Sequence, residues 1–225
     1  FPHMGSTFLG GSAVKEALQH SVNLVHALSA DMMKRADRVA RKLNVPLIVT
    51  CNRLEESELR SISNFKGQGV VAVSRAIRER IVNVAGLPQD RIRVIHNGLD
   101  LARMPRPAFV DNAPIGNWRC PVIGTLGHLS QKKGQRVFLQ AVKLLIEEGL
   151  DAEFVVLGDG PDRTALRSLA DQVNVTERVI FTPHTVSGQW NQVNVVCEPS
   201  LQEGLGMSVM QAMATGIPVV ANGVG

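Results

Sequence analysis

The fold is decided by PSLQEGLGMSVMQAMATGIPVVANGVG, residues 199–225. From Met207 onward its apolar residues recur at helical spacing, and Gly216 and Pro218 are placed to end that helix. Residues 217–221 are apolar and β-branched enough to form a buried parallel strand. The segment therefore predicts a turn, a helix and a strand, in the order found in α/β proteins.

The turn before this helix has the features of an anion site. Gly204 and Gly206 allow a tight turn with exposed N–H groups, and the helix that begins near Met207 directs the positive end of its dipole at the same point. Glu203 supplies a carboxylate beside it, and Leu205 lies between the glycines. The turn predicts a site for a phosphate, although glycines that only permit packing remain an alternative.

Apolar runs and amphipathic helical stretches alternate along almost the whole chain, which predicts parallel sheets with helices on both faces. Prolines recur between residues 104 and 121, where the alternation breaks. We therefore expect a domain over residues 1–103, a linker over residues 104–120 and a domain over residues 121–225. The expected strands are residues 23–26, 46–50, 69–73, 93–96, 122–126, 153–157, 178–181, 194–197 and 217–221, and the main helices before residue 199 are residues 29–43, 58–65, 74–85, 134–148 and 162–173.

The composition limits the classes of protein to which this chain can belong. The chain has 225 residues, 44% of them hydrophobic, with 24 basic and 20 acidic side chains and a net charge of +4. These values are typical of a folded globular protein, and the mild positive excess suits an anionic ligand or a membrane surface. Because no basic stripe is interleaved with aromatic residues, we expect no nucleic acid partner. The basic helix over residues 31–43 suggests peripheral contact with an anionic membrane, with a solvated outer face as the alternative.

The cysteines point to a reducing compartment. Cys51, Cys120 and Cys197 lie far apart in or beside apolar runs, so we expect free thiols, no metal site and a cytoplasmic protein, at most peripheral to the inner face of the membrane. No apolar stretch reaches the roughly 18 residues that span a bilayer. Position 1 is not methionine and the sequence stops just after a strand, so we expect a fragment that lacks both ends.

The closing segment resembles the donor-binding signature of the family 4 (group 1) glycosyltransferases of the GT-B fold, in which two glutamates eight positions apart contact a nucleotide-sugar. Glu203 matches the first glutamate, and Gln211 replaces the second. The elements around Asn97-Gly98 and Gly158-Asp-Gly-Pro161 resemble the same family in the same order. The resemblance implies two Rossmann-like domains that face a cleft, both incomplete in this chain.

The loop of residues 124–134 follows a strand and precedes a helix, so it lies at the carboxyl end of a sheet, where α/β proteins bind ligands. By resemblance, Lys133 binds the donor diphosphate, His128 replaces an arginine with the same task, and Gly127 lines the donor site. A solvated helix start is the alternative interpretation of Lys133. In the first domain, Asn52 stands where the family has a histidine near the reacting sugar.

The resemblance implies transfer of a sugar from a nucleotide-sugar to an unknown sugar, lipid or small-molecule acceptor, with retention at the anomeric carbon. Lys133, Glu203, His128 and Asn52 are the expected catalytic residues, and no metal or other cofactor is expected, because Lys133, His128 and the helix dipole supply positive charge. The alternatives are a nucleotide-sugar 2-epimerase of the same fold and a non-catalytic nucleotide-sugar-binding protein, since Asn52, His128 and Gln211 all depart from the family.

Overall fold

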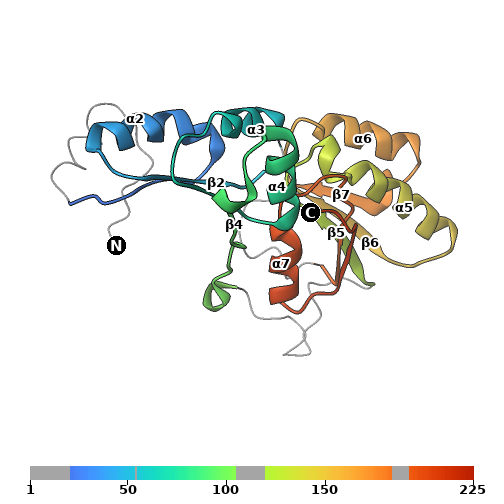
Figure 1. The fold of residues 1–225 in the computed structure, drawn as a ribbon. Helices are drawn as coiled ribbons and strands as arrows, with labels where there is room; N and C mark the ends of the chain where they lie inside the picture. Colours follow the sequence, from blue (N-terminus) through green and yellow to red (C-terminus); the bar gives the residue numbers. More distant parts are fainter. Residues whose placement is uncertain (1–20, 54, 105–119, 184–192) are drawn as a thin grey trace. The chain divides into compact units, whose positions relative to one another are not determined.

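The computed structural model describes residues 21–53, 55–104, 120–183 and 193–225. The chain divides into two compact units, one of Phe1–Asn97 together with Gly225 and one of Gly98–Val224. Most of the predicted linker, residues 105–119, lies outside the described residues. Each unit is built on one parallel sheet (Figure 1), so the α/β class expected from the sequence is confirmed.

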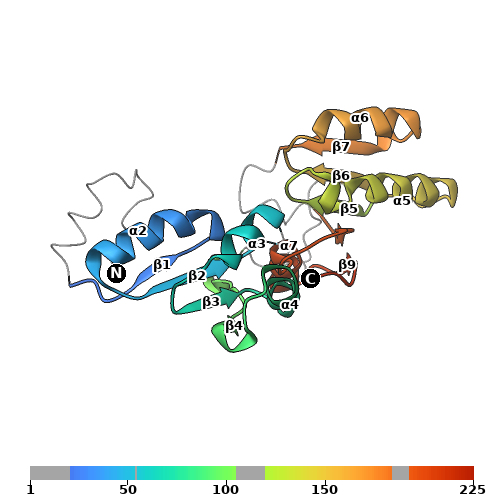
Figure 2. The same cartoon turned by 45° about the horizontal axis from the view of Figure 1, so that its top comes forward.

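The described residues of the first unit contain a four-stranded parallel sheet. Its elements are β1 (Val25–Ala27), α2 (Met33–Leu43), β2 (Leu47–Cys51), α3 (Glu56–Ser63), β3 (Gly69–Ala72), α4 (Arg75–Arg80) and β4 (Ile92–Val94). The strands lie in the order β1-β2-β3-β4, and Figures 1 and 2 show α2 and α3 along one face of them. Leu59 and Ile62 of α3 are fully buried, as are Val49 of β2 and Ala72 of β3. The apolar sides of the helices and the sheet thus form one core.

Local sequence sets the ends of these helices. Asn44 ends α2 in the left-handed conformation, with a φ of 53°, which asparagine tolerates better than most residues. Ser74 caps α4, because its hydroxyl accepts a hydrogen bond of 3.2 Å from the backbone N–H of Ile77. Such a cap satisfies one of the backbone donors that a helix start leaves without an intrahelical partner. A π-helical turn over Ile81–Ala85 extends α4, so the helix expected over residues 74–85 is present in two parts.

In the second unit, the described strands form a five-stranded parallel sheet in the order β7-β6-β5-β8-β9. Its elements are β5 (Val122–Leu126), α5 (Gln135–Glu147), β6 (Glu153–Leu157), α6 (Arg163–Gln172), β7 (Val179–Thr182), β8 (Val195–Glu198), α7 (Met207–Ala214) and β9 (Val219–Ala221). Figure 2 shows α5 and α6 side by side over the strands, and the two helices contact each other. This sheet is the scaffold of the candidate site.

Both faces of this sheet are buried. Along β6, Phe154 and Val156 pack into a core with residues of α5 and α6, whereas Val155 and Leu157 pack on the other face with Ala212 of α7. Side chains alternate between the two faces of a strand, so a strand covered on both sides needs a continuous apolar run. The sequence EFVVL of β6 meets that need.

The elements expected from the sequence agree closely with those observed. Among the described residues, every expected strand is present with its ends shifted by at most two residues. The helix expected from residue 134 begins one residue later, because Gly134 adopts the left-handed conformation, with a φ of 67°. Within the described part of the chain, no helix is long and apolar enough to cross a membrane.

Candidate functional site

The strand order of the second sheet reverses between β5 and β8. The chain proceeds outward from β5 through β6 to β7, then returns to place β8 and β9 on the other side of β5. At such a reversal the loops after the two central strands run in opposite directions, and they leave a crevice at the carboxyl ends of the strands. The loop after β5 carries Lys133, and the loop after β8 carries Glu203.

The two loops approach each other closely at Gly134. A β-carbon on this residue would lie 1.9 Å from the carbonyl oxygen of Pro199, a distance that no side chain can accommodate. The positive φ of Gly134 also favours glycine. The backbone N–H of Leu201 donates a hydrogen bond of 2.7 Å to the carbonyl of Lys132, which ties the same loops together. Lys133 is therefore presented from a fixed backbone.

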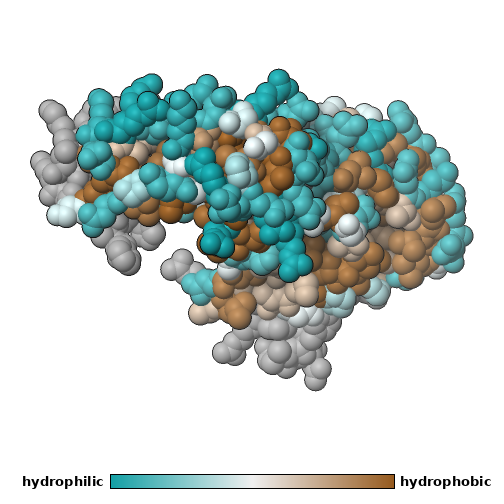
Figure 3. Space-filling model, in the orientation of Figure 1, coloured by the Kyte–Doolittle hydropathy of each residue, from teal (hydrophilic) through white to brown (hydrophobic). Residues whose placement is uncertain are grey.

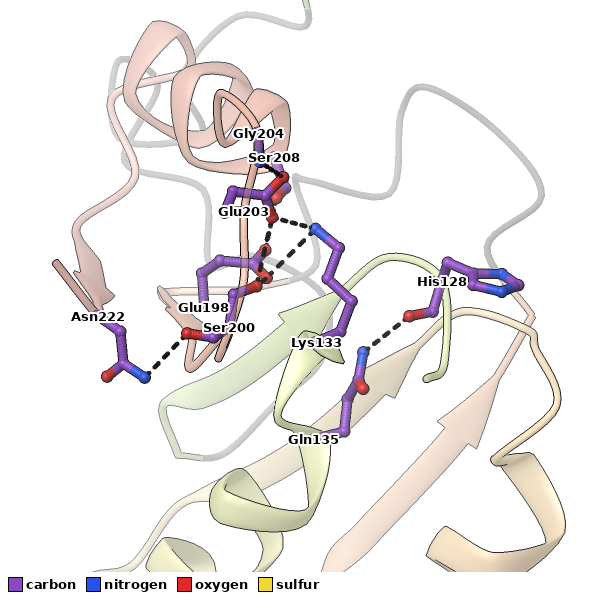
Figure 4. A network of polar contacts seen from close by, with 9 residues as sticks. All are labelled: His128, Lys133, Gln135, Glu198, Ser200, Glu203, Gly204, Ser208 and Asn222. Atoms are coloured by element: carbon purple, nitrogen blue, oxygen red, sulfur yellow. Dashed lines mark hydrogen bonds and ion pairs between the residues drawn. The ribbon is translucent and has the colours of Figure 1, made fainter. Parts of the chain in front are cut away.

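Lys133 lies between two carboxylates (Figure 4). Its ammonium contacts Glu203 Oε2 in a short ion pair and lies 3.7 Å from Glu198 Oε1. The Lys133 side chain is 23% exposed and that of Glu203 is 17% exposed, so both are shielded but remain within reach of a ligand. The structure thus brings together Lys133 and Glu203, which are 70 residues apart in the sequence.

Glu198 is a member of this cluster that the sequence did not reveal. It is the last residue of β8, it is 2% exposed, and both of its carboxylate oxygens accept hydrogen bonds from serines. Ser200 Oγ donates to Oε1 at 2.6 Å, and Ser208 Oγ, in the first turn of α7, donates to Oε2. The available signal was a charged residue at the end of an apolar strand, since a buried carboxylate needs partners.

The turn that leads into α7 uses one of its own backbone donors in an internal hydrogen bond. The backbone N–H of Gly204 donates a hydrogen bond of 3.1 Å to Glu203 Oε1, so this donor already has an acceptor. Gly206 adopts the left-handed conformation with a φ of 74° and precedes Met207, the first residue of α7. Leu205 and Met207 are half-buried. The expected presentation of backbone donors by residues 204–207 stays a prediction.

Gln211 and His128 come from two different elements of the second unit. Gln211 is half-buried on α7, whereas His128 is exposed in the loop after β5. Figure 4 shows the His128 ring turned away from the Lys133 ammonium, and Gln135 Nε2 donates a hydrogen bond of 3.1 Å to the His128 backbone carbonyl. Nearby Gly127 has a φ of 133° and donates its N–H to the carbonyl of Leu157 at 2.9 Å. This loop is held through its backbone, which leaves the imidazole outside the ion cluster.

Asn52 belongs to the first unit, unlike the other predicted site residues. It follows β2 directly, and its side-chain amide donates a hydrogen bond of 2.6 Å to the carbonyl of Leu28. The amide therefore holds the loop after β1 in this structure. Its expected role near a reacting sugar stays a prediction.

The arrangement at the carboxyl edge of the second sheet can serve two kinds of chemistry. Carboxylates accept hydrogen bonds from the hydroxyls of a polyol, and an ammonium group stabilises phosphate charge. Because Glu198 and Glu203 face one ammonium, the three groups carry one net negative charge. Among the described residues, no group of three or more His, Cys, Asp or Glu side chains is arranged to hold a metal ion.

The cysteines are free thiols, as expected, but they differ in burial. Cys51 is fully buried, whereas Cys120 and Cys197 are partly exposed. Burial raises the pKa of Cys51 to about 12, with a further contribution from the neighbouring Glu58. Burial also raises the pKa of the Cys197 thiol. Both thiols are therefore poor nucleophiles at neutral pH.

Comparison with known proteins identifies both halves of the chain. Residues 2–103 match the family model described as glycosyltransferase family 4, and residues 120–225 match that of the glycosyl transferases group 1. The chain is 31% identical to the 2-deoxystreptamine glucosyltransferase of Streptomyces kanamyceticus over 83% of its own length and 55% of that protein. It is 33% identical to WcaL, a putative colanic acid biosynthesis glycosyltransferase of Escherichia coli, over 60% of its own length and 35% of that protein. It thus spans about half the length, or less, of these curated relatives.

Solved structures give the fold. HepE of Anabaena, determined with UDP and glucose, matches with a TM-score of 0.78 and 21% identity, over 95% of this chain and 62% of that one. Sucrose-phosphate synthase of Thermosynechococcus elongatus matches with a TM-score of 0.76 and 18% identity, over 94% and 58%. These likenesses confirm the expected GT-B type of fold. The two family matches show that each half of the chain belongs to a glycosyltransferase family, residues 2–103 to family 4 and residues 120–225 to group 1.

Proposed function

We propose that this chain acts in the transfer of a sugar from a nucleotide diphosphate sugar to an acceptor, with retention at the anomeric carbon. The observation that carries the proposal is the Lys133 ammonium at the switch point of the second sheet, held against Glu203. The relatives support a sugar nucleotide as donor, since HepE binds UDP and UDP-glucose. We propose a UDP-hexose as the first donor to test.

The diphosphate leaving group is the proposed ligand of Lys133. When the bond between the sugar and the phosphate breaks, negative charge develops on the diphosphate, and a fixed ammonium stabilises that charge more in the transition state than in the ground state. In the structure the ammonium is already paired with Glu203. The donor therefore has to share or displace this pair, which leaves Glu203 to accept hydrogen bonds from the sugar hydroxyls.

Glu198 is proposed as a positioning residue. Its carboxylate is fixed by Ser200 and Ser208 and lies 3.7 Å from the Lys133 ammonium. It therefore links β8, the first turn of α7 and the lysine. A carboxylate so deeply buried would not touch the donor, and we expect it to act by holding Lys133 in place.

The remaining assignments follow the family resemblance. Gln211 would meet the ribose, Gly127 and residues 204–207 would line the donor site, and His128 and Asn52 would act near the diphosphate and the reacting sugar. Positive charge from Lys133 and the N-terminus of α7 would replace a divalent metal ion. The acceptor stays open, because the acceptors named for the relatives, such as 2-deoxystreptamine, belong to those proteins.

The test uses the natural full-length protein, incubated with UDP-, GDP- and ADP-sugars and a panel of hydroxyl acceptors. We expect transfer from one donor class, a product with the donor's anomeric configuration by NMR, and an unchanged rate in EDTA. Conversion of the donor sugar without acceptor would indicate the epimerase instead. Nucleotide binding by calorimetry without any turnover would indicate a non-catalytic binding protein.

A further inference from the structure

The first unit contains a pocket that the proposed donor site does not explain. It lies between α2 and α3 and has a volume of about 280 Å³. Its apolar floor is formed by Met33, Leu47 and Phe65, which are 6%, 3% and 5% exposed. The guanidinium of Arg91 lies 5.6 Å from the centre of the Phe65 ring, so a cation–π contact helps to fix the position of this ring. A buried floor gives this pocket a defined shape.

The pocket continues toward the amino ends of the strands. A second hollow of about 440 Å³ shares Asp37, Arg41, Leu47 and Lys66 with it and extends to Gln68. Leu47 is the first residue of β2, whereas Asn52 follows the last one. The two hollows form a groove that reaches the edge of the sheet opposite to Asn52. We call it the α2-α3 groove.

The groove is rimmed by positive charge. Lys34, Arg41, Arg60 and Lys66 line the 280 Å³ pocket together with a single carboxylate, that of Asp37. Figure 3 shows hydrophilic side chains gathered over α2. Four cations and one anion leave a surplus of positive charge around a concave surface, which attracts anions.

Two of these cations are already paired, and two are available. Arg41 contacts Asp37 at 2.6 Å, and Arg60 contacts Glu56 at 2.5 Å, in exposed pairs within their own helices. Exposed pairs of this kind contribute little free energy, so an incoming anion can compete for the guanidinium groups. For Lys34 and Lys66, no ion pair is found among the described residues.

We propose that the α2-α3 groove binds a phosphate-bearing ligand. Its phosphate contacts Lys34, Lys66 and the two arginines, and its less polar part lies on Met33, Leu47 and Phe65. Arginine and lysine together are a common phosphate-binding combination, because the guanidinium donates a planar pair of hydrogen bonds and the ammonium adds a compact charge. The phosphate can come from a soluble phosphoester or from an anionic lipid headgroup. This site is independent of the donor site and does not rest on the proposed transfer reaction.

The test compares two double variants with the same loss of charge. Lys34→Gln/Lys66→Gln removes two cations from the groove, whereas Arg35→Gln/Lys42→Gln removes two exposed cations of α2 that do not line it. Binding of glycerol 3-phosphate is followed by NMR, and binding to vesicles of phosphatidylcholine, with and without phosphatidylglycerol, is followed by sedimentation. Thermal unfolding confirms that each variant is folded.

We expect the groove variant to lose roughly tenfold or more in affinity, and the control variant to lose less than about threefold. Loss with glycerol 3-phosphate supports a soluble ligand, and loss confined to vesicles that contain phosphatidylglycerol supports a lipid headgroup. Equal losses in the two variants would overturn the proposal, because they would indicate diffuse attraction. Failure of the wild-type protein to bind either probe would also overturn it. Lys133→Ala should leave this binding unchanged, which separates the groove from the donor site.

Discussion

Each of the two units buries a glutamate near the carboxyl end of a strand, but the two carboxylates have different partners. Glu198 ends β8 and is 2% exposed, and Glu58 lies on α3 beside Cys51, the last residue of β2, and is 4% exposed. Glu198 accepts hydrogen bonds from two serines and has the Lys133 ammonium at 3.7 Å. The side-chain partner of Glu58 is the thiol of Cys51, with 3.7 Å between the sulfur and Oε2.

The difference teaches that burial alone does not make a carboxylate part of a site. Burial raises the pKa of Glu58, an effect that Arg53 opposes and Asp31 reinforces. Burial disfavours the charged form of a carboxylate unless polar partners compensate for the lost water. The two glutamates are similarly buried and differ in those partners. Strand order explains the contrast. The described strands of the first sheet follow one another in sequence, but the second sheet reverses between β5 and β8 and so brings two distant loops together.

The largest effect is expected from Lys133→Ala. If the cluster of the second sheet carries the chemistry, kcat/KM for the donor falls by about 10² to 10³, because removal of one charge-stabilising group in a transition state has that magnitude. Steady-state kinetics of sugar transfer measure it. The matched control is Lys132→Ala, an exposed lysine next to it in the same turn. Similar losses in both variants would contradict the role of Lys133.

A somewhat smaller effect, on stability, is expected from Glu198→Ala. The change leaves the hydroxyl of Ser208 without its acceptor, takes from Ser200 the nearer of its two carboxylate acceptors, and removes a buried anion beside Lys133. We expect a loss of about 2 to 3 kcal/mol in the free energy of unfolding. Urea denaturation measures it, with Glu147→Ala as control, since the exposed pair of Glu147 and Lys143 should contribute less than about 0.5 kcal/mol. Equal losses would mean that the cluster is no more than a surface ion pair.

A gain in stability, rather than a loss, is expected from Glu58→Gln. Because the folded-state pKa of Glu58 is raised above its ordinary value of 4.5, the folded protein binds this proton more tightly than the unfolded chain does. Its stabilising contribution is present below pH 4.5 and is lost as the pH rises through the folded-state pKa. The amide does not ionise, so the variant should unfold at a higher temperature than the wild type near neutral pH, and this advantage should shrink toward pH 4.5. A difference that does not change with pH would rule out this titration.

The smallest effect concerns the thiol next to Glu58. Cys51 is fully buried and its pKa is raised to about 12, whereas Cys120 is partly exposed. Iodoacetamide at mildly alkaline pH should therefore alkylate Cys120 in the native protein long before Cys51, as peptide mass spectrometry would show. Unfolding in urea should make the two rates similar. Rapid alkylation of native Cys51 would mean that the buried pair with Glu58 opens readily.

The sequence predicted the fold well because the fold depends on local patterns. The apolar run of β6 and the glycines around α7 are readable residue by residue, and the expected strand at residues 153–157 is the observed one. The site was predicted in part. Lys133 and Glu203 do contact each other. Glu198 was missed, because the sequence does not show which residues will contact a carboxylate at the end of a strand. Its partner Ser208 lies on the following helix, and Lys133 comes from a different strand loop.

By itself, the sequence determined the alternation of strands and helices and the turn before α7, and it named Glu203 and Lys133 as candidate site residues. Only the tertiary structure decided that His128 points away from Lys133, that Gly204 donates to Glu203, and that Glu198 is enclosed by serines. The physical reason is distance along the chain. Hydrophobic period and turn chemistry act over a few residues, whereas the charge and hydrogen bonding of a buried group depend on which loops the strand order places beside it.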